Sequence, residues 1–516
     1  PYTRGEDSGQ NQWTWQHYNA TVGYDGTFGR HVVSASAGIL YNIYKTDFSQ
    51  NGAAGKMVEY RHMTVNGAVN YAYDDRYVAT FSFAADGSDN YRPGNRWGFY
   101  PSLGLGWIVS RERFLRDSRM VDLLKLRASV GKNGWDPMGE MRYLWEGYYT
   151  GRGGLNTGNS EHTWHGGTAL SYLPNPDVFA EKSLKYDAGI DLRLWNRLSL
   201  NVDLFLEKRS GIVTQDWMIP GASGVDNPPY RNIGRMTNKG FEVQLSWADR
   251  IGDFNYALTG MASYNSNKVD YMAEVVTVPT AARTGRRLDA LFGYVADGFY
   301  DWDDFDVGGE LREGLPKPTF GAVQPGDIKY KNLNGDTVID ENDQTAIGDS
   351  YLPKLQYSFS LAASYKGFDL FALFQGAAGR DVNLLDAPLQ NVAFRDNGNV
   401  YGIAEGRWAY YPEQGIDTRA TATYPRLSLQ DNSNNYRNST LWKRSGDFLK
   451  LRNVELGYTF AQPSLSKAGI SKIRIYLSGV NLLTVSRLMR DYDIDPEILS
   501  GHPALKSYNL GLTVTF

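Results

Sequence analysis

The 516-residue sequence contains no cysteine, which excludes both a disulfide framework and a thiolate metal site. No apolar run approaches the 18 or more residues that a transmembrane helix needs. An excess of basic charge is also missing, because 53 Lys and Arg face 57 Asp and Glu, and this balance argues against a nucleic-acid partner. Strands of a transmembrane barrel place only alternate residues against lipid, so these absences leave a β-barrel membrane protein open.

Recognisable enzyme motifs are missing too. The six His show no paired spacing, and neither a GxSxG elbow nor a phosphate-binding loop is present. The acidic pair Asp303-Asp304 resembles glycosidase carboxylates in type only, since catalysis needs a set separation in space. We therefore expect no enzyme activity. The sequence begins at Pro1 without a charged and apolar leader, so we expect a signal peptide and a plug domain to lie outside this chain.

Glycine and aromatic residues are abundant, with 55 Gly and 35 Tyr, as in proteins with many strands and turns. The segment Gly326–Asp381 shows this most clearly. Odd positions from Leu355 to Tyr365 are apolar and even positions are polar or small, and after Gly367 the alternation resumes from Phe368 to Phe374. Because successive strand side chains point to opposite faces, this predicts a hairpin between an apolar and a polar solvent.

The same alternation predicts strands elsewhere, over residues 64–73, 76–85, 95–110, 123–131, 184–194, 198–206, 241–247, 254–258, 448–460, 473–479 and 507–516. A short helix is expected over 111–115. Several strands carry charge opposite their apolar face, at Asp187, Asp191, Arg193, Asp203 and Glu207. A soluble sandwich core would not hide these charges, whereas a barrel with a wet interior would place them on its inner wall.

The connections between these strands alternate in length. Short turns are expected near 195–197, 248–252, 366–367 and 461–471, and long connections near 212–236, 271–350, 381–440 and 487–502. Alternate connections of an up-and-down barrel emerge on opposite rims, so all long ones share one rim. The sequence therefore predicts an all-β fold, a transmembrane antiparallel up-and-down β-barrel with long extracellular loops, and roughly 14 to 17 strands in this chain.

Ordered segments along the chain carry a family resemblance. They are YPSLGLGW with SRERF (100–114), LRASVGKNG (126–134), NPDVFAEKSLKYDAGIDL (175–192), NKGFEVQL (238–245), GYVADGFY (293–300), GDIKYKNLNGDTVIDENDQTAIG (326–348), YKGFDLFALFQGAAGRDV (365–382), FLKLRNVELGYTF (448–460), and RIYLSGVNLLT (474–484) with DPE (495–497). Together they resemble the C-terminal half of SusC-like TonB-dependent transporters, the nutrient importers named for a starch-utilisation system.

This resemblance implies a place in the cell and a set of partners. It implies that residues 1–516 form the barrel region of an outer-membrane protein of about 22 strands, with the plug domain absent from this chain. It further implies a SusD-like surface lipoprotein that acts as a lid. Contact with the TonB complex is expected through the absent N-terminal part.

One polar loop has the oxygen spacing of an EF-hand. Its predicted ligands are Asn332, Asn334, Asp336, the carbonyl of Val338, Asp340 and Asp343, a set that would suit Ca²⁺. Two departures weaken the match, since the first ligand is Asn and Thr337 stands where the tight turn favours Gly. The alternative is a polar turn held by Asx hydrogen bonds.

Aromatic residues in the predicted loops and strand ends suggest binding platforms. The predicted substrate-binding residues are Trp135, Trp164, Trp302 and Trp408, accompanied by Trp217, Tyr410 and Tyr411. Aromatic rings stack on sugar rings or peptide side chains, but they also form interfacial girdles and pack loops. Both interpretations remain open for each residue.

Three functions follow from these observations. The first is TonB-dependent import of oligosaccharides or peptides through a plugged barrel. The second is a surface β-protein that binds carbohydrate without transport, and the third is a secreted glycoside hydrolase. The ordered segments and the unequal rims favour the importer.

Overall fold

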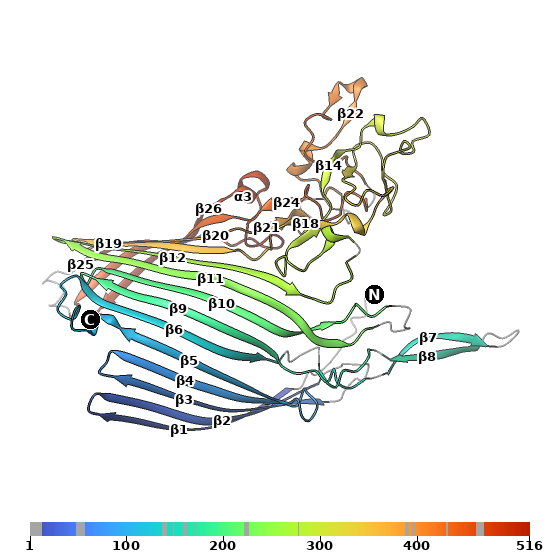
Figure 1. The fold of residues 1–516 in the computed structure, drawn as a ribbon. Coiled ribbons are helices and arrows are strands. Elements are labelled where there is room, and N and C mark those ends of the chain that lie inside the picture. Colours follow the sequence, from blue (N-terminus) through green and yellow to red (C-terminus); the bar gives the residue numbers. More distant parts are fainter. Residues whose placement is uncertain are drawn as a thin grey trace, which may run out of the picture. The chain divides into compact units, whose positions relative to one another are not determined.

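The computed structural model describes residues 13–47, 57–136, 142–147, 149–157, 163–170, 172–220, 227–276, 278–386, 392–394, 398–429, 432–460 and 469–516. The chain divides into two compact units (Figure 1). The first unit comprises residues 1–192, 203–239 and 270–275, and the second comprises 193–202, 240–269 and 276–516. None of the helices in the described residues is long and apolar enough to cross a membrane.

Fifteen strands form one antiparallel sheet in the order β1-β2-β3-β4-β5-β6-β9-β10-β11-β12-β19-β20-β25-β26-β27, within the predicted range of 14 to 17. Their bounds are β1 Trp13–Phe28, β2 His31–Asp47, β3 Met57–Tyr73, β4 Tyr77–Ser88, β5 Trp97–Ile108, β6 Val121–Trp135, β9 Glu181–Leu194, β10 Leu198–Gln215, β11 Tyr230–Ile251, β12 Phe254–Tyr271, β19 Leu355–Tyr365, β20 Phe368–Ala378, β25 Phe448–Phe460, β26 Lys472–Ser486 and β27 Ser507–Thr515.

The first unit shows how local chemistry sets the turns. Asp74 and Asp75 connect β3 to β4 with φ of 53° and 51°, the left-handed pair of a type I′ hairpin turn, which Asp tolerates better than most residues. The helix expected over 111–115 is wrong. A 3-10 turn at Val109–Arg111 ends at an extended Glu112, because so short a connection cannot offset the cost of nucleating an α-helix.

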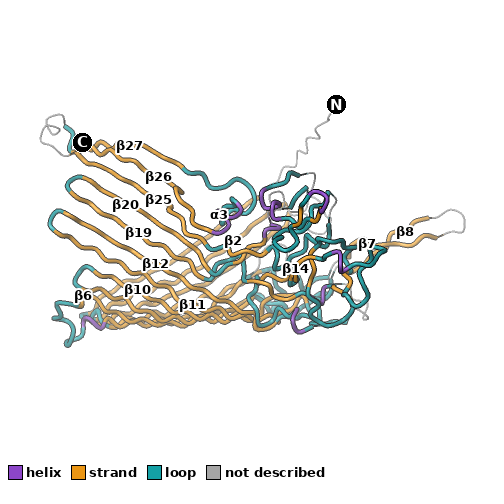
Figure 2. Tube along the Cα trace, turned by 90° about the horizontal axis from the view of Figure 1, so that it is seen from above, coloured by secondary structure: helices purple, strands orange, loops and turns teal. Residues whose placement is uncertain are grey.

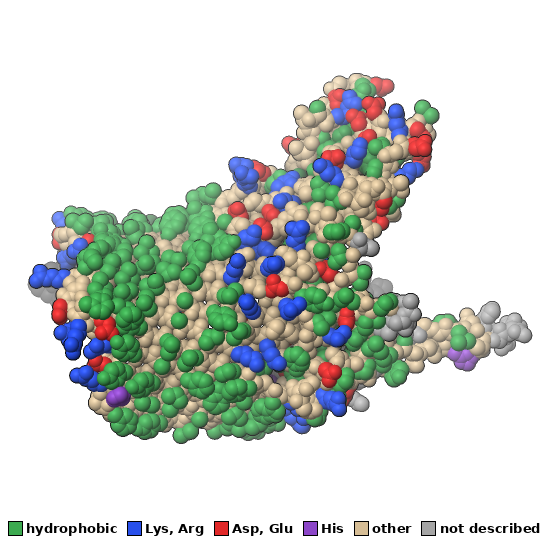
Figure 3. Space-filling view, in the orientation of Figure 1, with side chains coloured by type: hydrophobic (Ala, Val, Ile, Leu, Met, Phe, Trp, Pro, Cys, Tyr) green, Lys and Arg blue, Asp and Glu red, His purple; other side chains and the backbone are tan. Residues whose placement is uncertain are grey.

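The apolar face of the strands is exposed. In β3, β4 and β5 the paired residues Val65, Ala85 and Phe99 lie in one row across the sheet, and 43% of Leu103 and 56% of Leu105 is exposed on the same face of β5. Figure 3 shows hydrophobic side chains spread over the strands. A water-soluble sheet would cover such a face, so its surroundings are expected to be apolar.

The hairpin predicted around Gly367 is confirmed in the second unit. β19 and β20 pair from Leu355↔Ala378 to Tyr365↔Phe368, and Gly367 turns with a φ of 90°. A Cβ at this position would lie 2.9 Å from the carbonyl oxygen of Thr459, so the turn requires glycine. Figure 2 shows β19, β20, β25, β26 and β27 side by side.

Long connections carry the remaining elements. They contain the strands β7 Tyr149–Thr157, β8 Thr163–Leu170, β13 Leu291–Gly293, β14 Ala296–Phe299, β15 Lys317–Pro318, β16 Ile328–Tyr330, β17 Val338–Ile339, β18 Thr345–Gly348, β21 Asp381–Asn383, β22 Tyr410–Tyr411, β23 Ile416–Asp417 and β24 Lys443–Ser445, and the helix α3 Arg487–Tyr492. Short 3-10 turns lie at Pro279–Ala281, Trp302–Asp304, Glu341–Asp343, Leu384–Asp386, Gly402–Gly406 and Pro412–Gln414.

The loops of the second unit enclose a hydrophobic core of their own. Tyr294, Ile328, Ile339, Tyr424 and Trp442 are among its buried residues. These residues come from connections that follow β12 and β20, far apart in the sequence. The long connections of this unit are therefore a folded region supported by the sheet.

The predicted alternation of turn length is confirmed. Short turns join β9 to β10, β11 to β12, and β19 to β20, whereas 83 residues (272–354) separate β12 from β19. In an antiparallel sheet, alternate connections lie at opposite strand ends. The long connections therefore share one rim, which we call the long-loop rim.

Candidate transport face and loop sites

The polar face of the first unit carries a cluster around Arg127. Its guanidinium lies 2.7 Å from Oδ2 of Asp203, 3.3 Å from Oδ1 of Asp191 and 3.6 Å from Oδ1 of Asp187. Gly189 makes this arrangement possible, because a Cβ there would lie 2.5 Å from the guanidinium carbon. Three carboxylates thus surround one cation on the face opposite the apolar residues, as the sequence predicted for Asp187, Asp191 and Asp203.

The polar face of the second unit repeats this arrangement. Arg474 donates from Nε to Oδ1 of Asp369 at 3.0 Å and from a terminal nitrogen to Glu455 at 2.6 Å. A Cβ at Gly457 would lie 2.6 Å from the same guanidinium. In both units an arginine lies flat over a strand glycine between acidic neighbours.

The DPE motif folds back onto the polar face of β25. Lys450, buried to 1% exposure, donates from Nζ to Oδ1 of Asp495 at 2.7 Å and to Oε2 of Glu497 at 2.7 Å. Arg452 pairs with the other oxygen of Glu497. A buried ammonium needs such partners, so these contacts fix the last long connection against the strand.

The same contacts set the protonation of the loop carboxylate. Burial raises the pKa of Glu497, but hydrogen bonds from Arg452 and Lys450 outweigh it and hold this pKa below its usual range. Glu497 is therefore charged at neutral pH, and its attraction for both cations is fully present there.

Asp327, in the segment GDIKY, organises the loop core of the second unit. Its fully buried carboxylate accepts hydrogen bonds from the side chains of Asn432 and Asn435, each at 2.9 Å, and from the backbone of Gln324 at 2.8 Å. Arg426 adds an ion pair at 2.7 Å. Sequence reasoning missed this residue, and the one available indication was the run Asn432 to Asn435, whose role depends on contacts across about a hundred residues.

In the predicted calcium loop, side-chain oxygens accept from the loop itself. Both oxygens of Asp343 accept backbone N–H groups, from Leu333 at 2.7 Å and Asp340 at 2.9 Å. Asp336 accepts from the backbone of Val338 at 2.9 Å and from the side chain of Asn334 at 2.8 Å. These are the Asx hydrogen bonds of a polar turn. Within the described residues, no three His, Asp or Glu side chains are grouped to hold a metal ion.

The four predicted platform residues differ in exposure. Trp135 and Trp164 in the first unit and Trp302 in the second are 58%, 60% and 56% exposed. Trp408 is buried, and its ring lies over Gly326, where a Cβ would approach it to 2.5 Å. Its environment is that of a packing residue, whereas the other three rings are open to a ligand. Among the accompanying aromatics, Trp217 and Tyr411 are exposed and Tyr410 stacks on Arg419 at 3.9 Å.

Comparison with known proteins identifies this architecture. The family model described as TonB dependent receptor-like, beta-barrel matches residues 1–482. The chain belongs to this family of TonB-dependent receptor β-barrels. Its apolar strand face therefore lies against outer-membrane lipid, its polar face lines the barrel interior, and its long-loop rim is extracellular.

Individual relatives agree with this assignment. TonB-dependent receptors P3 and P26 of Formosa agariphila are 26% and 29% identical over 96% and 92% of this chain, and they are covered over 51% and 48% of their own length. TonB-dependent receptor SusC of Bacteroides thetaiotaomicron is 26% identical over 87% of this chain and is covered over 43%. The chain spans about half the length of these curated relatives.

A solved structure supports the fold. The structure titled RagAB peptide transporter superposes with a TM-score of 0.72 over 98% of this chain and 56% of that one, at 21% identity. At this identity the match concerns the fold alone. It agrees with a transmembrane antiparallel barrel, of which this chain supplies 15 strands of the main sheet.

Proposed function

We propose that this chain is the barrel of a SusC-type nutrient importer. Its substrate is an oligosaccharide or a peptide, which binds at the extracellular loops and passes through the barrel interior. The observation that carries the proposal is the sheet with two different faces, since charged clusters such as that of Arg127 line a face that lipid cannot solvate. Family membership supports a transporter over an enzyme.

Oligosaccharides are the favoured substrates in this proposal. Trp135, Trp164 and Trp302 are exposed aromatic rings on or beside the long loops, and flat aromatic surfaces stack on sugar rings at little entropic cost. The relatedness to the receptor named SusC supports the same class, while the fold shared with the RagAB peptide transporter supports peptides.

Uptake by cells that produce the full-length receptor tests the proposal. Deletion of the gene is expected to abolish growth on one class of oligosaccharide or peptide, and the intact gene restores it. Trp302→Ala should then weaken uptake about tenfold or less, the range of one lost stacking contact. Trp195→Ala is the matched control, because Trp195 is also exposed but lies in the short β9–β10 turn.

Partners are the second part of the proposal. A SusD-like lipoprotein covers the long-loop rim, and the TonB complex supplies energy through a segment outside this chain. The receptor purified from outer membranes in mild detergent should carry the lipoprotein, as mass spectrometry of its subunits would show. Uptake that persists without a proton gradient would contradict the TonB part. Binding without uptake would favour the surface carbohydrate-binding protein instead.

Calcium binding by the 332–343 loop stays a prediction. Metal binding would require Asp336 and Asp340 to exchange backbone N–H donors for the ion. Titration of the full-length receptor with Ca²⁺, followed by calorimetry, tests it, with Asp336→Asn as the variant expected to lose the heat. No heat in the wild type would leave the Asx-bonded turn as the sole description.

A further inference from the structure

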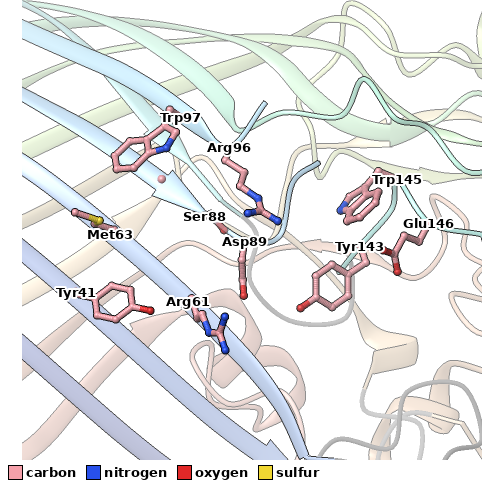
Figure 4. Close-up of a pocket in the computed structure, with 11 residues that line it drawn as sticks. Tyr41, Arg61, Met63, Ser88, Asp89, Arg96, Trp97, Tyr143, Trp145 and Glu146 are labelled. Atoms are coloured by element: carbon pink, nitrogen blue, oxygen red, sulfur yellow. The ribbon is translucent and has the colours of Figure 1, made fainter. Parts of the chain in front are cut away.

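The first unit contains a pocket of about 490 Å³ at the long-loop rim, where β3, β4 and β5 meet residues 142–147. Figure 4 shows Tyr41, Met63 and Trp97 on one side and Tyr143 and Trp145 on the other. Arg61 and Arg96 lie between these two groups. Aromatic, aliphatic and cationic groups therefore converge on one volume.

The strand register assigns this pocket to the lipid side of the sheet. Tyr41 pairs with Met63, Met63 with Gly87, and Gly87 with Trp97, so these four residues lie in one row across β2 to β5. Two residues further along the strands, the same face carries Val65 and Phe99, both exposed. Because side chains alternate with a period of two, the pocket opens toward lipid and not into the barrel interior.

The floor of the pocket is flat and apolar. A Cβ at Gly87 would lie 2.8 Å from the Trp97 ring, so the indole rests directly on the β4 backbone. Further from the rim, the ring centroids of Phe99 and Phe83 are 5.9 Å apart, and those of Phe83 and Phe81 are 6.3 Å apart. The floor thus continues into an aromatic strip that runs along the membrane-facing wall.

The wall nearer the loops is cationic. Arg96 donates from Nε to the carbonyl of Tyr91 at 3.0 Å, which fixes its guanidinium, and among the described residues it forms no ion pair. Arg61 is exposed and pairs with Glu59, a carboxylate that it shares with Lys45.

The carboxylates of this wall are largely matched by cations. Buried Arg142 pairs with Asp89 at 3.0 Å and stacks on the Tyr60 ring at 3.3 Å. Glu146 is exposed at the edge of the pocket. Four cations (Lys45, Arg61, Arg96 and Arg142) therefore stand against three carboxylates (Glu59, Asp89 and Glu146), and the two arginines that face the cavity are available to an anion.

We propose that this pocket binds the phosphate-bearing headgroup of an outer-membrane lipid, whose acyl chains lie along the strip formed by Phe81, Phe83 and Phe99. Arginine guanidinium groups match phosphate oxygens in pairs, and Trp and Tyr rings favour the membrane–water boundary at which such a headgroup lies. The site goes beyond import, because it faces away from the barrel interior.

Lipid retention by the purified full-length receptor tests the proposal. The detergent-solubilised protein is incubated with phosphatidic acid or with phosphatidylcholine, and bound lipids are counted by native mass spectrometry. Arg61→Gln with Arg96→Gln should lower retention of phosphatidic acid about tenfold, the effect of lost charge-assisted hydrogen bonds. Retention of phosphatidylcholine should change little. Equal retention of both lipids by the wild type would overturn the proposal.

Two controls separate this site from general effects. Arg116→Gln removes an exposed arginine from the short β5–β6 connection, and an equal loss there would show a response to net charge only. Inorganic phosphate that binds as tightly as phosphatidic acid would show a free-anion site and would overturn the lipid assignment.

The floor is tested without any change of charge. Gly87→Ala should displace the Trp97 ring and lower phosphatidic-acid retention severalfold. Gly104→Ala is its control, since a Cβ there meets only ordinary contacts at 3.8 Å or more. Heat-modifiable gel migration confirms that both variants fold. Undiminished retention in a folded Gly87→Ala variant would show that the apolar floor takes no part.

Discussion

The strands and the long loops of the second unit bury their side chains in opposite ways. In β26, Leu477 is 61% exposed on the apolar face, whereas Trp442 in the loop core is 1% exposed. The loop core resembles that of a water-soluble protein, because its residues come from distant connections and converge on a dry centre. The strands have no such core on their outer face.

This difference shows that one chain satisfies two solvents. The strands gain stability from a continuous hydrogen-bond ladder and from lipid, and the loops gain it from buried apolar area and paired charges. The same kind of substitution should therefore have different costs in the two regions. The predictions below test this comparison.

The largest effect is expected in the loop core. Trp442→Ala removes a buried ring and the hydrogen bond from its Nε1 to the carbonyl of Asn435 at 2.7 Å, and should lower the free energy of unfolding of the loops by about 3–5 kcal/mol. Hydrogen exchange of loop peptides measures this. Trp302→Ala, at an exposed ring, should change it by only about 0.5 kcal/mol. Equal effects would contradict the presence of a dry core.

A similar loss is expected at the contact between loop and strand. Lys450→Met leaves buried Asp495 without its cation and should destabilise the last long connection by about 3–5 kcal/mol. Limited proteolysis within residues 487–506 reports it. The double variant Lys450→Met with Asp495→Leu should recover part of the loss, because it leaves no unpaired buried charge. A double variant as sensitive as the single one would show that this pair does not hold the loop.

The two faces of β26 offer the most direct comparison of solvents. Leu477→Lys places a cation against lipid and should cost about 2–4 kcal/mol near the bilayer midplane. Ser478→Lys, one residue later on the polar face, should cost little. Urea-induced unfolding in lipid vesicles, followed by tryptophan fluorescence, measures both. Equal costs would contradict the assignment of the faces.

The smallest effect is expected from pH. The folded pKa of Glu497 is depressed, so its contribution to stability is fully present above its unfolded pKa of about 4.3 and is lost as pH falls through the folded pKa. Proteolysis of the last long connection should therefore increase with acid. Glu497→Gln should remove this part of the pH dependence, and an unchanged acid response would assign it to other carboxylates.

The sheet was predictable because each strand lies between lipid and water. That boundary forces the alternation seen from Leu355 to Tyr365, which the sequence shows without any tertiary information. The charges at Asp187, Asp191 and Asp203 followed from the same rule. The short helix over 111–115 failed because the space between two paired strands, and not helix propensity, decides the conformation there.

The loop sites were less predictable, for a physical reason. Asp327 is held by Asn432 and Asn435, which are 105 and 108 residues away, and no local pattern reports such contacts. Trp408 and Trp302 are the same residue type in neighbouring loops of one unit, yet the first lies over Gly326 and the second is exposed. Exposure depends on tertiary packing, so composition alone could not separate a platform from a packing residue.

The glycines beneath Arg127 and Arg474 have a consequence for passage through the barrel. Without a Cβ at Gly189 or Gly457, each guanidinium lies against the backbone rather than projecting from it. The charges are thereby recessed into the wall. A bulky solute that moves past these positions meets a smooth, wet surface, whose fixed charges hold water and present few side chains that would have to be displaced.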